Sequence, residues 1–201
     1  YLSTHVHSQH SERCVGLERA TPDHSYIGCE NAKAGRVPRF WELSSEFAWV
    51  LGFYCGDGSA SNGDKHMISF GGQNESNIRR VKHFFDEVLE DELSIIEDVD
   101  SRTGNKMYYY RVQRKSAVSF FVEGLDAGIG SSGKKVPEVI LNGDRELKKS
   151  FIEGYFEADG SREKDHDARY NSESMRFSTK SAQLANQVHY ILKQLELGEN
   201  R

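Results

Sequence analysis

Two stretches of the chain carry the same pattern of large apolar and small residues, and each ends in an acid followed by glycine. The first, EFAWVLGFYCGDG, ends at Gly58, and the second, KKSFIEGYFEADG, ends at Gly160. Because apolar residues recur on helical faces in both, the pattern predicts helices over residues 42–57 and 145–159. The two glycines are 102 residues apart (160 − 58), which indicates an internal repeat.

The acid at the end of each predicted helix is unfavourable for stability alone. A carboxylate at a helix C-terminus faces the negative end of the helix dipole, and the chain repeats this arrangement at Asp57 and Asp159. A cation between the two carboxylates would remove the penalty. A buried core helix explains the apolar residues and the glycines, but not two matched acids. The glycine after each acid, Gly58 or Gly160, is predicted to form a left-handed C-terminal cap.

Small residues occupy matching positions in the two predicted helices. Gly52 and Gly56 lie four residues apart in the first, and Gly154 and Ala158 repeat the spacing in the second. Small residues at this spacing allow another helix backbone to approach closely. The four positions are therefore predicted to form the interface between the helices. The candidates to cap the first helix are Ser44 and Ser45.

Further elements follow the first helix. Alternating residues around Asn62-Gly63 predict a hairpin over residues 59–71, with its turn at these two residues. Apolar residues at helical spacing predict a helix over residues 74–90. Two strands and a helix capped by Ser116 are predicted over residues 94–125.

An equivalent but shorter series follows the second helix. A strand is predicted over residues 173–178 and a helix over residues 180–197. Phe70 and Phe177 then correspond at an offset of 107 (177 − 70), so the second loop is five residues longer (107 − 102). The chain is expected to lack the end of its second repeat, because equivalents of residues 94–125 do not follow.

Composition narrows the class of protein. Of the 201 residues, 37% are hydrophobic and 11% aromatic, which is enough for a packed core. The formal net charge is −5, so any face that binds a polyanion must be local. Three cysteines without paired spacing, and no apolar run of membrane-spanning length, favour an intracellular, reducing location. The chain starts with Tyr1 rather than methionine, so it is expected to be a fragment or an excised element.

Charge is unevenly distributed along the chain. Residues 86–100 hold eight acids and no base, which predicts a solvated surface that faces away from a polyanion. Residues 106–115 hold four bases and three tyrosines, and predict a strand whose alternate residues can pack on helices or meet DNA. The candidate DNA-binding residues are Lys106, Tyr108, Arg111, Gln113, Arg114 and Lys115. The alternative is an edge strand protected by its charge.

The two repeated helices resemble the signature helices of LAGLIDADG homing endonucleases. The segments VLGFYCGDG and IEGYFEADG carry the resemblance. It implies an α+β fold with pseudo-twofold symmetry, in which two αββαββα-like repeats pack through the small residues of these helices. It also implies that Asp57 and Asp159 hold divalent metal, Mg²⁺, over the DNA phosphates.

The segment between the repeats, residues 126–144, starts with a Gly/Ser-rich linker and continues with Lys134-Lys-Val-Pro. This resembles the Lys-x-Pro segment before the second signature helix of intein endonucleases, whose lysine lies near the scissile phosphates. The resemblance implies that Lys134 or Lys135 stabilises charge or helps to activate water. Taken alone, a Lys-Lys pair is usually solvated. Repeat 1 then covers about residues 41–125, and repeat 2 starts at residue 145.

Residues 1–40 resemble part of a Hint splicing domain, the fold of inteins. Thr21-Pro-Asp-His24 matches a Thr-x-x-His motif whose histidine polarises the upstream splice junction, so the resemblance assigns splicing roles to Thr21 and His24. Thr-Pro-Asp is also an ordinary turn. The chain has neither a splice nucleophile at its start nor a terminal His-Asn, and is not expected to splice as it stands. A zinc site of unusual spacing is the other reading of this segment, with His5, His7, His10 and Cys14 as ligands.

Together these resemblances imply that residues 41–201 make a Mg²⁺-dependent double-strand break in an intein-free host allele. The parent element is expected to splice itself out from between its host exteins. Both signature helices lie on one chain, so a monomer and a long, non-palindromic double-stranded DNA site are expected. The protein would be cytoplasmic, and associated with the nucleoid when bound to DNA.

Two alternatives remain from the sequence. One is a LAGLIDADG module that binds DNA, or helps RNA splicing, without cleaving. The other is a splicing element whose endonuclease has decayed.

Overall fold

The computed structural model describes residues 26–28, 36–38, 41–62, 66–90, 93–164 and 173–199. Several predictions for the N-terminal segment lie outside these residues. They concern the proposed splicing residues Thr21 and His24, and the possible zinc ligands His5, His7, His10 and Cys14. Within the described residues, no helix combines the length and the hydropathy needed to cross a membrane.

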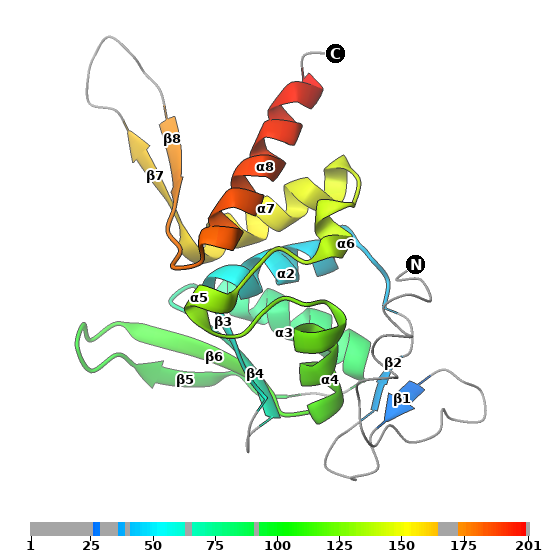
Figure 1. Cartoon of the computed structure of the whole chain (residues 1–201). Coiled ribbons are helices and arrows are strands. Elements are labelled where there is room, and N and C mark those ends of the chain that lie inside the picture. The colour runs from blue at the N-terminus through cyan, green and yellow to red at the C-terminus, as the bar shows by residue number, and fades with distance from the viewer. Residues whose placement is uncertain are drawn as a thin grey trace.

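Two long helices, α2 (Ser45–Asp57) and α7 (Arg145–Asp159), lie side by side at the centre of the molecule (Figure 1). Both end at the acids where the sequence predicts them to end. Ser44 caps α2, because its side-chain oxygen accepts a hydrogen bond from the Phe47 amide at 3.2 Å. Asp144 caps α7 in the same way.

The two helices approach so closely that their backbones touch. A Cβ atom built on Gly52 would lie 2.8 Å from the amide nitrogen of Tyr155 and would overlap the neighbouring carbonyl of α7. A Cβ atom on Gly154 would lie 3.0 Å from the Cα atom of Trp49 and would overlap the carbonyl of that residue. Glycine is therefore required at both positions, where each helix leaves room for the backbone of the other.

A four-stranded antiparallel sheet lies on one side of this helix pair. Its strand order is β3-β4-β6-β5. The strands are β3 (Gly58–Asn62), β4 (His66–Gly72), β5 (Ile96–Val99) and β6 (Lys106–Val112). Helices α3 (Glu75–Leu89) and α4 (Lys115–Ser119) pack against this sheet, and the π-helix η2 (Phe120–Gly124) continues from α4.

The pairing register gives the sheet two different faces. Ile68, Phe70, Tyr110 and Val112 are fully buried in the core, and we call their face the helix side. Side chains alternate along each strand, so the intervening residues lie on the opposite face. We call this opposite face the open face; it is formed by Ser59, Ser61, Met67, Ser69, Gly71, Ile96, Asp98, Met107, Tyr109 and Arg111.

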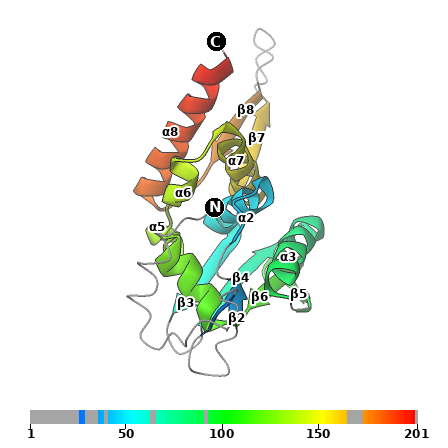
Figure 2. The ribbon, with the colours of Figure 1, turned by 90° about the vertical axis from the view of Figure 1, so that its right-hand side faces the viewer.

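The second half of the chain lies on the other side of the helix pair (Figures 1 and 2). Phe177 stacks on Tyr155 of α7, with ring centroids 5.2 Å apart. Helix α8 also packs against α7, so one apolar contact surface holds the hairpin and the helix together. The elements on that side are β7 (Gly160–Lys164), β8 (Glu173–Phe177) and α8 (Ala182–Glu199). The segment between the halves forms α5 (Gly130–Gly133), which contacts β3, and α6 (Glu138–Leu141), which contacts α7.

The chain before α2 also enters the core of the first half. Strands β1 (Tyr26–Gly28) and β2 (Arg36–Pro38) form an antiparallel pair. Val37 is buried, and the ring of the buried Trp41 stacks on Phe120 with centroids 4.4 Å apart. Val37 and Trp41 therefore belong to the same apolar cluster as the buried residues of α2 and α7.

The predicted left-handed caps are wrong. Gly58 and Gly160 have φ values of −81° and −80°, which are ordinary extended conformations. Each glycine is the first residue of a strand, so the chain leaves the helix directly into a hairpin. Space, and not backbone conformation, requires glycine here. A Cβ atom at Gly58 would lie 2.6 Å from the carbonyl oxygen of Tyr54, and one at Gly160 would lie 2.5 Å from that of Phe156.

The predicted hairpin turn and the predicted cap of α4 also differ from the structure. Asn62 pairs with His66, so residues 63–65 connect the strands and Asn62 belongs to β3. The residue before α4 is Arg114, and Ser116 lies buried inside the helix. The helix begins at Lys115, soon after β6 ends, so Ser116 lies one residue too far along the chain to cap it.

The helix contact leads to a stability prediction. Gly52→Ala places a methyl group against the backbone of α7, and should lower the free energy of unfolding by about 3 kcal/mol, the upper end of overpacking costs. Gly133→Ala is the control, since a Cβ atom there meets nothing within 4 Å. Its effect should stay within about 0.5 kcal/mol. Urea unfolding would measure both, and equal midpoints for the two variants would contradict the close helix contact.

Candidate active site

The acids that end the two central helices meet where α2 and α7 run into their hairpins. The Cβ position of Gly56 lies 3.3 Å from the amide nitrogen of Asp159 and 3.4 Å from its Cβ atom. Ala158 occupies the equivalent small position in the other helix and packs directly on Gly56. The small residues therefore bring the next residue of each helix, Asp57 and Asp159, to a common surface. Both of these side chains reach solvent.

Both carboxyl groups have raised pKa values. Desolvation by the surrounding protein, together with the nearby Asp159 carboxylate, raises the pKa of Asp57 to about 6, against the opposing effect of Lys134. Desolvation also raises the pKa of Asp159, again against the effect of Lys134. The pair therefore resists carrying two negative charges at once. A divalent cation would favour the doubly ionised form.

Lys134 is the lysine that the structure brings to these acids. Its side chain is only 6% exposed, and Nζ donates a hydrogen bond to the carbonyl oxygen of Gly56 at 2.5 Å. That carbonyl belongs to the last turn of α2, where carbonyl oxygens have no amide partner within the helix. Burial lowers the pKa of Lys134, while Cys55, Asp159 and Asp57 act in the opposite direction.

Lys135 points elsewhere. Its ammonium group forms an ion pair with Asp126, and its carbonyl oxygen accepts a hydrogen bond from Cys55 Sγ at 3.6 Å. The segment before the lysines is fixed to α2, because the Tyr54 hydroxyl donates to the Gly128 carbonyl at 2.7 Å. This connection sets which of the two lysines faces the acids.

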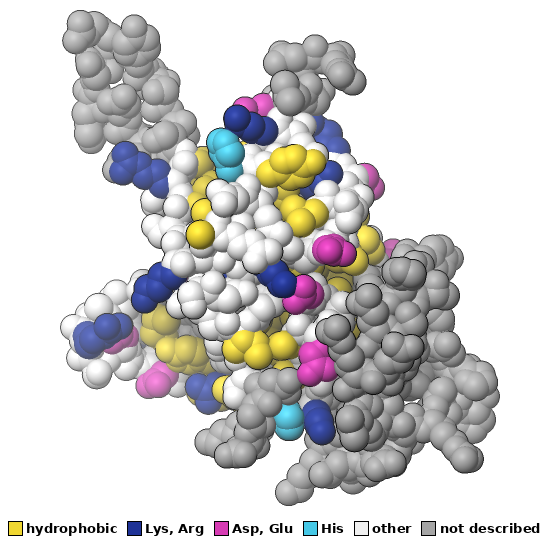
Figure 3. Space-filling view, viewed as in Figure 1, with side chains coloured by type: hydrophobic (Ala, Val, Ile, Leu, Met, Phe, Trp, Pro, Cys, Tyr) yellow, Lys and Arg dark blue, Asp and Glu magenta, His cyan; other side chains and the backbone are white. Residues whose placement is uncertain are grey.

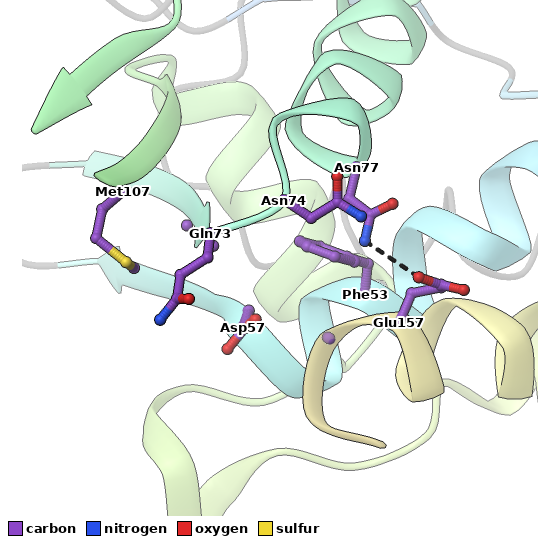
Figure 4. A pocket seen from close by; sticks show the side chains of 10 residues that line it. Phe53, Asp57, Gln73, Asn74, Asn77, Met107 and Glu157 are labelled. Carbon is purple, nitrogen blue, oxygen red and sulfur yellow. Dashed lines mark hydrogen bonds between the residues drawn. The ribbon is translucent and has the colours of Figure 1, made fainter. Parts of the chain in front are cut away.

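Each acid borders a cavity of its own. The first cavity, of about 350 Å³, lies beside Asp57 and between the two halves of the chain. Figure 4 shows its polar side chains, with Asn77 of α3 donating to Glu157 of α7 at 3.4 Å. The second cavity, of about 340 Å³, lies beside Asp159 and is also lined by Cys55, Lys134 and Lys180.

Several polar residues that line the cavities were not among the candidates from the sequence, and two of them occupy equivalent positions. Gln73 lines the first cavity and Lys180 lines the second. They are 107 residues apart (180 − 73), the offset that aligns Phe70 with Phe177. Each lies three residues after its phenylalanine, just beyond the strand. The repeat offset was thus the signal that could have identified them.

The structure separates the candidate DNA-binding residues. The strand β6 ends at Val112, so the predicted strand over residues 106–115 is too long. Of the six candidates, Arg111 lies on the open face and is exposed, and its guanidinium is 5.5 Å from the ring centroid of Tyr109. Gln113 is exposed just after the strand.

The other candidates lie toward the helices. Tyr108 packs against the core, and Lys106 shares its side of the strand, although its side chain is exposed. Arg114 donates to the carbonyl of Leu89 at 3.3 Å, and Lys115 is the first residue of α4. Side chains alternate between the two faces only within the strand. Because β6 ends at Val112, the predicted alternation does not extend to Arg114 and Lys115.

Part of the acidic segment, residues 86–100, lies on the open face of the sheet. Strand β5 pairs directly with β6, and Asp98 lies opposite Met107 on the open face. Glu97 lies opposite Tyr108 and belongs to the helix side. Figure 3 shows Lys and Arg side chains dispersed over this view of the molecule, with acidic side chains among them. Strand pairing therefore places the acidic strand β5 beside β6, the strand that carries Lys106 and Arg111, which a linear charge count does not anticipate.

The donor set fits a hard divalent cation. Asp57 and Asp159 supply carboxylate oxygens, the ligands that Mg²⁺ prefers. Among the described residues, no group of three or more His, Cys, Asp and Glu side chains is gathered at one metal site. Two carboxylates suit Mg²⁺, which usually keeps several waters and takes further ligands from phosphate.

The chain resembles known proteins in sequence and in fold. Residues 146–200 match the model of the LAGLIDADG-like domain family. The DNA polymerase of Thermococcus hydrothermalis is 30% identical over 166 residues, which cover 80% of this chain, and that of Acanthamoeba polyphaga mimivirus is 28% identical over 158 residues, which cover 76%. The chain spans only 9% of the length of each of these proteins.

Solved structures show the same fold. The homing endonuclease I-WcaI bound to its DNA recognition sequence has a TM-score of 0.52 at 17% identity, covering 78% of this chain and 70% of that chain. Mesophilic variants of the homing endonuclease I-DmoI give a TM-score of 0.50 at 20% identity, covering 78% and 74%. A further I-DmoI structure contains DNA and Ca, with a TM-score of 0.50. Residues 146–200 therefore resemble a LAGLIDADG-like domain, and the described residues have an α+β fold similar to that of these homing endonucleases.

The raised pKa of Asp57 leads to a prediction for the metal-free protein. The ordinary pKa is about 4, so folding favours the protonated acid, and this contribution to stability is lost as the pH rises through about 6. Asp57→Asn should therefore be more stable than the wild type at pH 7.5, by about 1 kcal/mol once solvent screening is included. Near pH 4 the two proteins should be equally stable.

Urea unfolding at the two pH values would measure this difference. Glu153→Gln, on the exposed face of α7, is the matched control. Added Mg²⁺ should stabilise the wild type more than Asp57→Asn, because ligands stabilise the state that binds them. If Asp57→Asn were less stable than the wild type at pH 7.5 without metal, the ionised Asp57 carboxylate could not be destabilising the fold.

Proposed function

We propose that this chain is the endonuclease part of an intein, and that it hydrolyses one phosphodiester bond in each strand of a double-stranded DNA site. The observation that supports this most strongly is the meeting of Asp57 and Asp159 at the ends of two tightly packed helices. Each acid borders its own cavity, so the arrangement offers two reaction centres, one for each strand.

The two carboxylates would hold Mg²⁺ between the centres. When bound, the metal would supply positive charge that activates water and stabilises the leaving 3′ oxygen. Hydrolysis forms a bond from a water oxygen to phosphorus and breaks the bond from phosphorus to the 3′ oxygen, which takes up a proton.

Lys134 acts in this proposal as a positioning residue. Its hydrogen bond to Gly56 fixes the end of α2, and its charge lies beside both carboxylates, where it offsets part of their mutual repulsion. Lys135, paired with Asp126, is left out of the reaction.

The open face would lie along the DNA. Arg111 offers a guanidinium for a phosphate or a guanine edge, and Tyr109 offers a flat ring beside it. Gln113 can reach a base from the end of the strand, whereas Tyr108 and Arg114 serve the fold. The two halves differ in sequence and in their sheets, so the site is expected to be long and non-palindromic and the protein to act as a monomer.

The intein context is supported by the relatives. A match that covers 80% of this chain but 9% of a DNA polymerase is what an element inserted in a polymerase would give. In the parent protein, residues 1–40 would belong to the splicing domain, with Thr21 and His24 at the upstream junction. The host exteins would then be those of a polymerase, and the protein would work inside the cell on chromosomal DNA.

A cleavage assay would test the function. The substrate would be double-stranded DNA carrying the site that the protein selects from a random-sequence library, together with an intein-free DNA polymerase gene. Mg²⁺-dependent double-strand cleavage is expected, and both Asp57→Asn and Asp159→Asn should abolish it. Selective binding without cleavage by the wild type would instead support the inactive DNA-binding alternative.

The two lysines allow a matched comparison. Lys134→Met removes the only cation that the described residues place against both acids, and should reduce the cleavage rate by about 100-fold, in the range for loss of one electrostatic contact. It should also raise the Mg²⁺ concentration needed for half-maximal rate. Lys135→Met breaks a partly exposed ion pair worth about 1 kcal/mol or less, and should cleave like the wild type. The reverse ranking would overturn the choice of Lys134.

A further inference from the structure

The two cavities beside the acids occupy equivalent places in the two halves of the chain. The helix offset of 102 relates Asp57 to Asp159, and also relates Cys55 in the second cavity to Glu157 in the first. The hairpin offset of 107 relates Gln73 in the first cavity to Lys180 in the second. The residues around Asp57 and those around Asp159 thus occupy equivalent positions in the two repeats, but they differ in chemical type.

The cavities differ in charge. The first is lined by two carboxylates, Asp57 and Glu157, and the described residues that line it include no lysine or arginine. The second is lined by one carboxylate, Asp159, and by two lysines, Lys134 and Lys180. The formal charges are therefore −2 and +1.

The charge of the first cavity is built into the fold. Asn77 is 9% exposed, and its side-chain amide donates to Glu157 at 3.4 Å, which holds this acid of α7 at the cavity wall. The position equivalent to Asn77 in the second half is Leu184, which is buried and offers no hydrogen bond. The two halves have therefore diverged in the residues that support each cavity as well as in those that line it.

We propose that the two centres act in a fixed order, with the strand at the Asp159 cavity cleaved first and the strand at the Asp57 cavity second. This inference rests on the proposed endonuclease function. A scissile phosphate is negative and gains further charge during hydrolysis, so a cavity with two lysines stabilises it better than one with two carboxylates. The first cut leaves a nicked duplex, and the second cut converts it into a double-strand break.

The residues at one equivalent position provide a reciprocal test. Lys180→Gln gives the second cavity the residue of the first, and Gln73→Lys does the opposite. Both side chains are exposed, so neither change should alter folding. The substrate is a duplex with the selected site, labelled at the 5′ end of either strand, and the two cuts are followed separately in Mg²⁺.

The wild type should accumulate DNA nicked in one particular strand. Lys180→Gln should slow that first cut by about tenfold or more, as expected for loss of a charged contact. Gln73→Lys should speed the second cut and reduce the nicked intermediate, and Glu157→Gln should act in the same direction by removing a carboxylate.

Several outcomes would overturn the order. They are simultaneous cutting of both strands by the wild type, equal slowing of both cuts by Lys180→Gln, or a first cut that Gln73→Lys accelerates. Each of these would leave the endonuclease function intact. Absence of all cleavage by the wild type would instead overturn the proposed function, and the order with it.

Discussion

The close approach of α2 and α7 is the contact on which the rest of the structure depends. Backbone atoms of one helix occupy the space that a side chain would need at Gly52 or Gly154 of the other. Because the backbones touch at these points, the ends of the helices can meet only in one register. That register sets Asp57 beside Asp159, and it sends one hairpin to each side of the helix pair.

The same contact creates an electrostatic cost. Two carboxylates lie at the negative ends of two helix dipoles, near each other and partly removed from water, so their pKa values rise. Lys134, which the linker brings in from between the repeats, offsets only part of this cost. Selection for stability alone would not retain such a cluster, whereas the proposed binding of a cation and a phosphate would use it. The difference between the two cavities shows that the repeats share this design without sharing every residue.

Much of the framework follows from the sequence because the repeated motif fixes two helices and their acidic ends. The first hairpin and α3 were also predictable, from the turn signal at Asn62-Gly63 and from apolar residues at helical spacing. Strand β7 was not, because its residues are polar and carry no apolar alternation. The choice between Lys134 and Lys135 was not, because it depends on how the linker docks on α2, through the hydrogen bond from Tyr54 to the Gly128 carbonyl. The end of β6 at Val112 is likewise set by pairing with its neighbours, and no local signal marks it.

The most direct test of the account is the position of a metal in crystals of the protein bound to its selected DNA. Anomalous diffraction from Mn²⁺, used in place of Mg²⁺, would locate the ion without relying on activity. We expect a peak within about 2.0–2.5 Å of carboxylate oxygens of both Asp57 and Asp159, the range of hard-cation coordination distances. A peak bound elsewhere, or DNA held with both carboxylates free of metal, would contradict it.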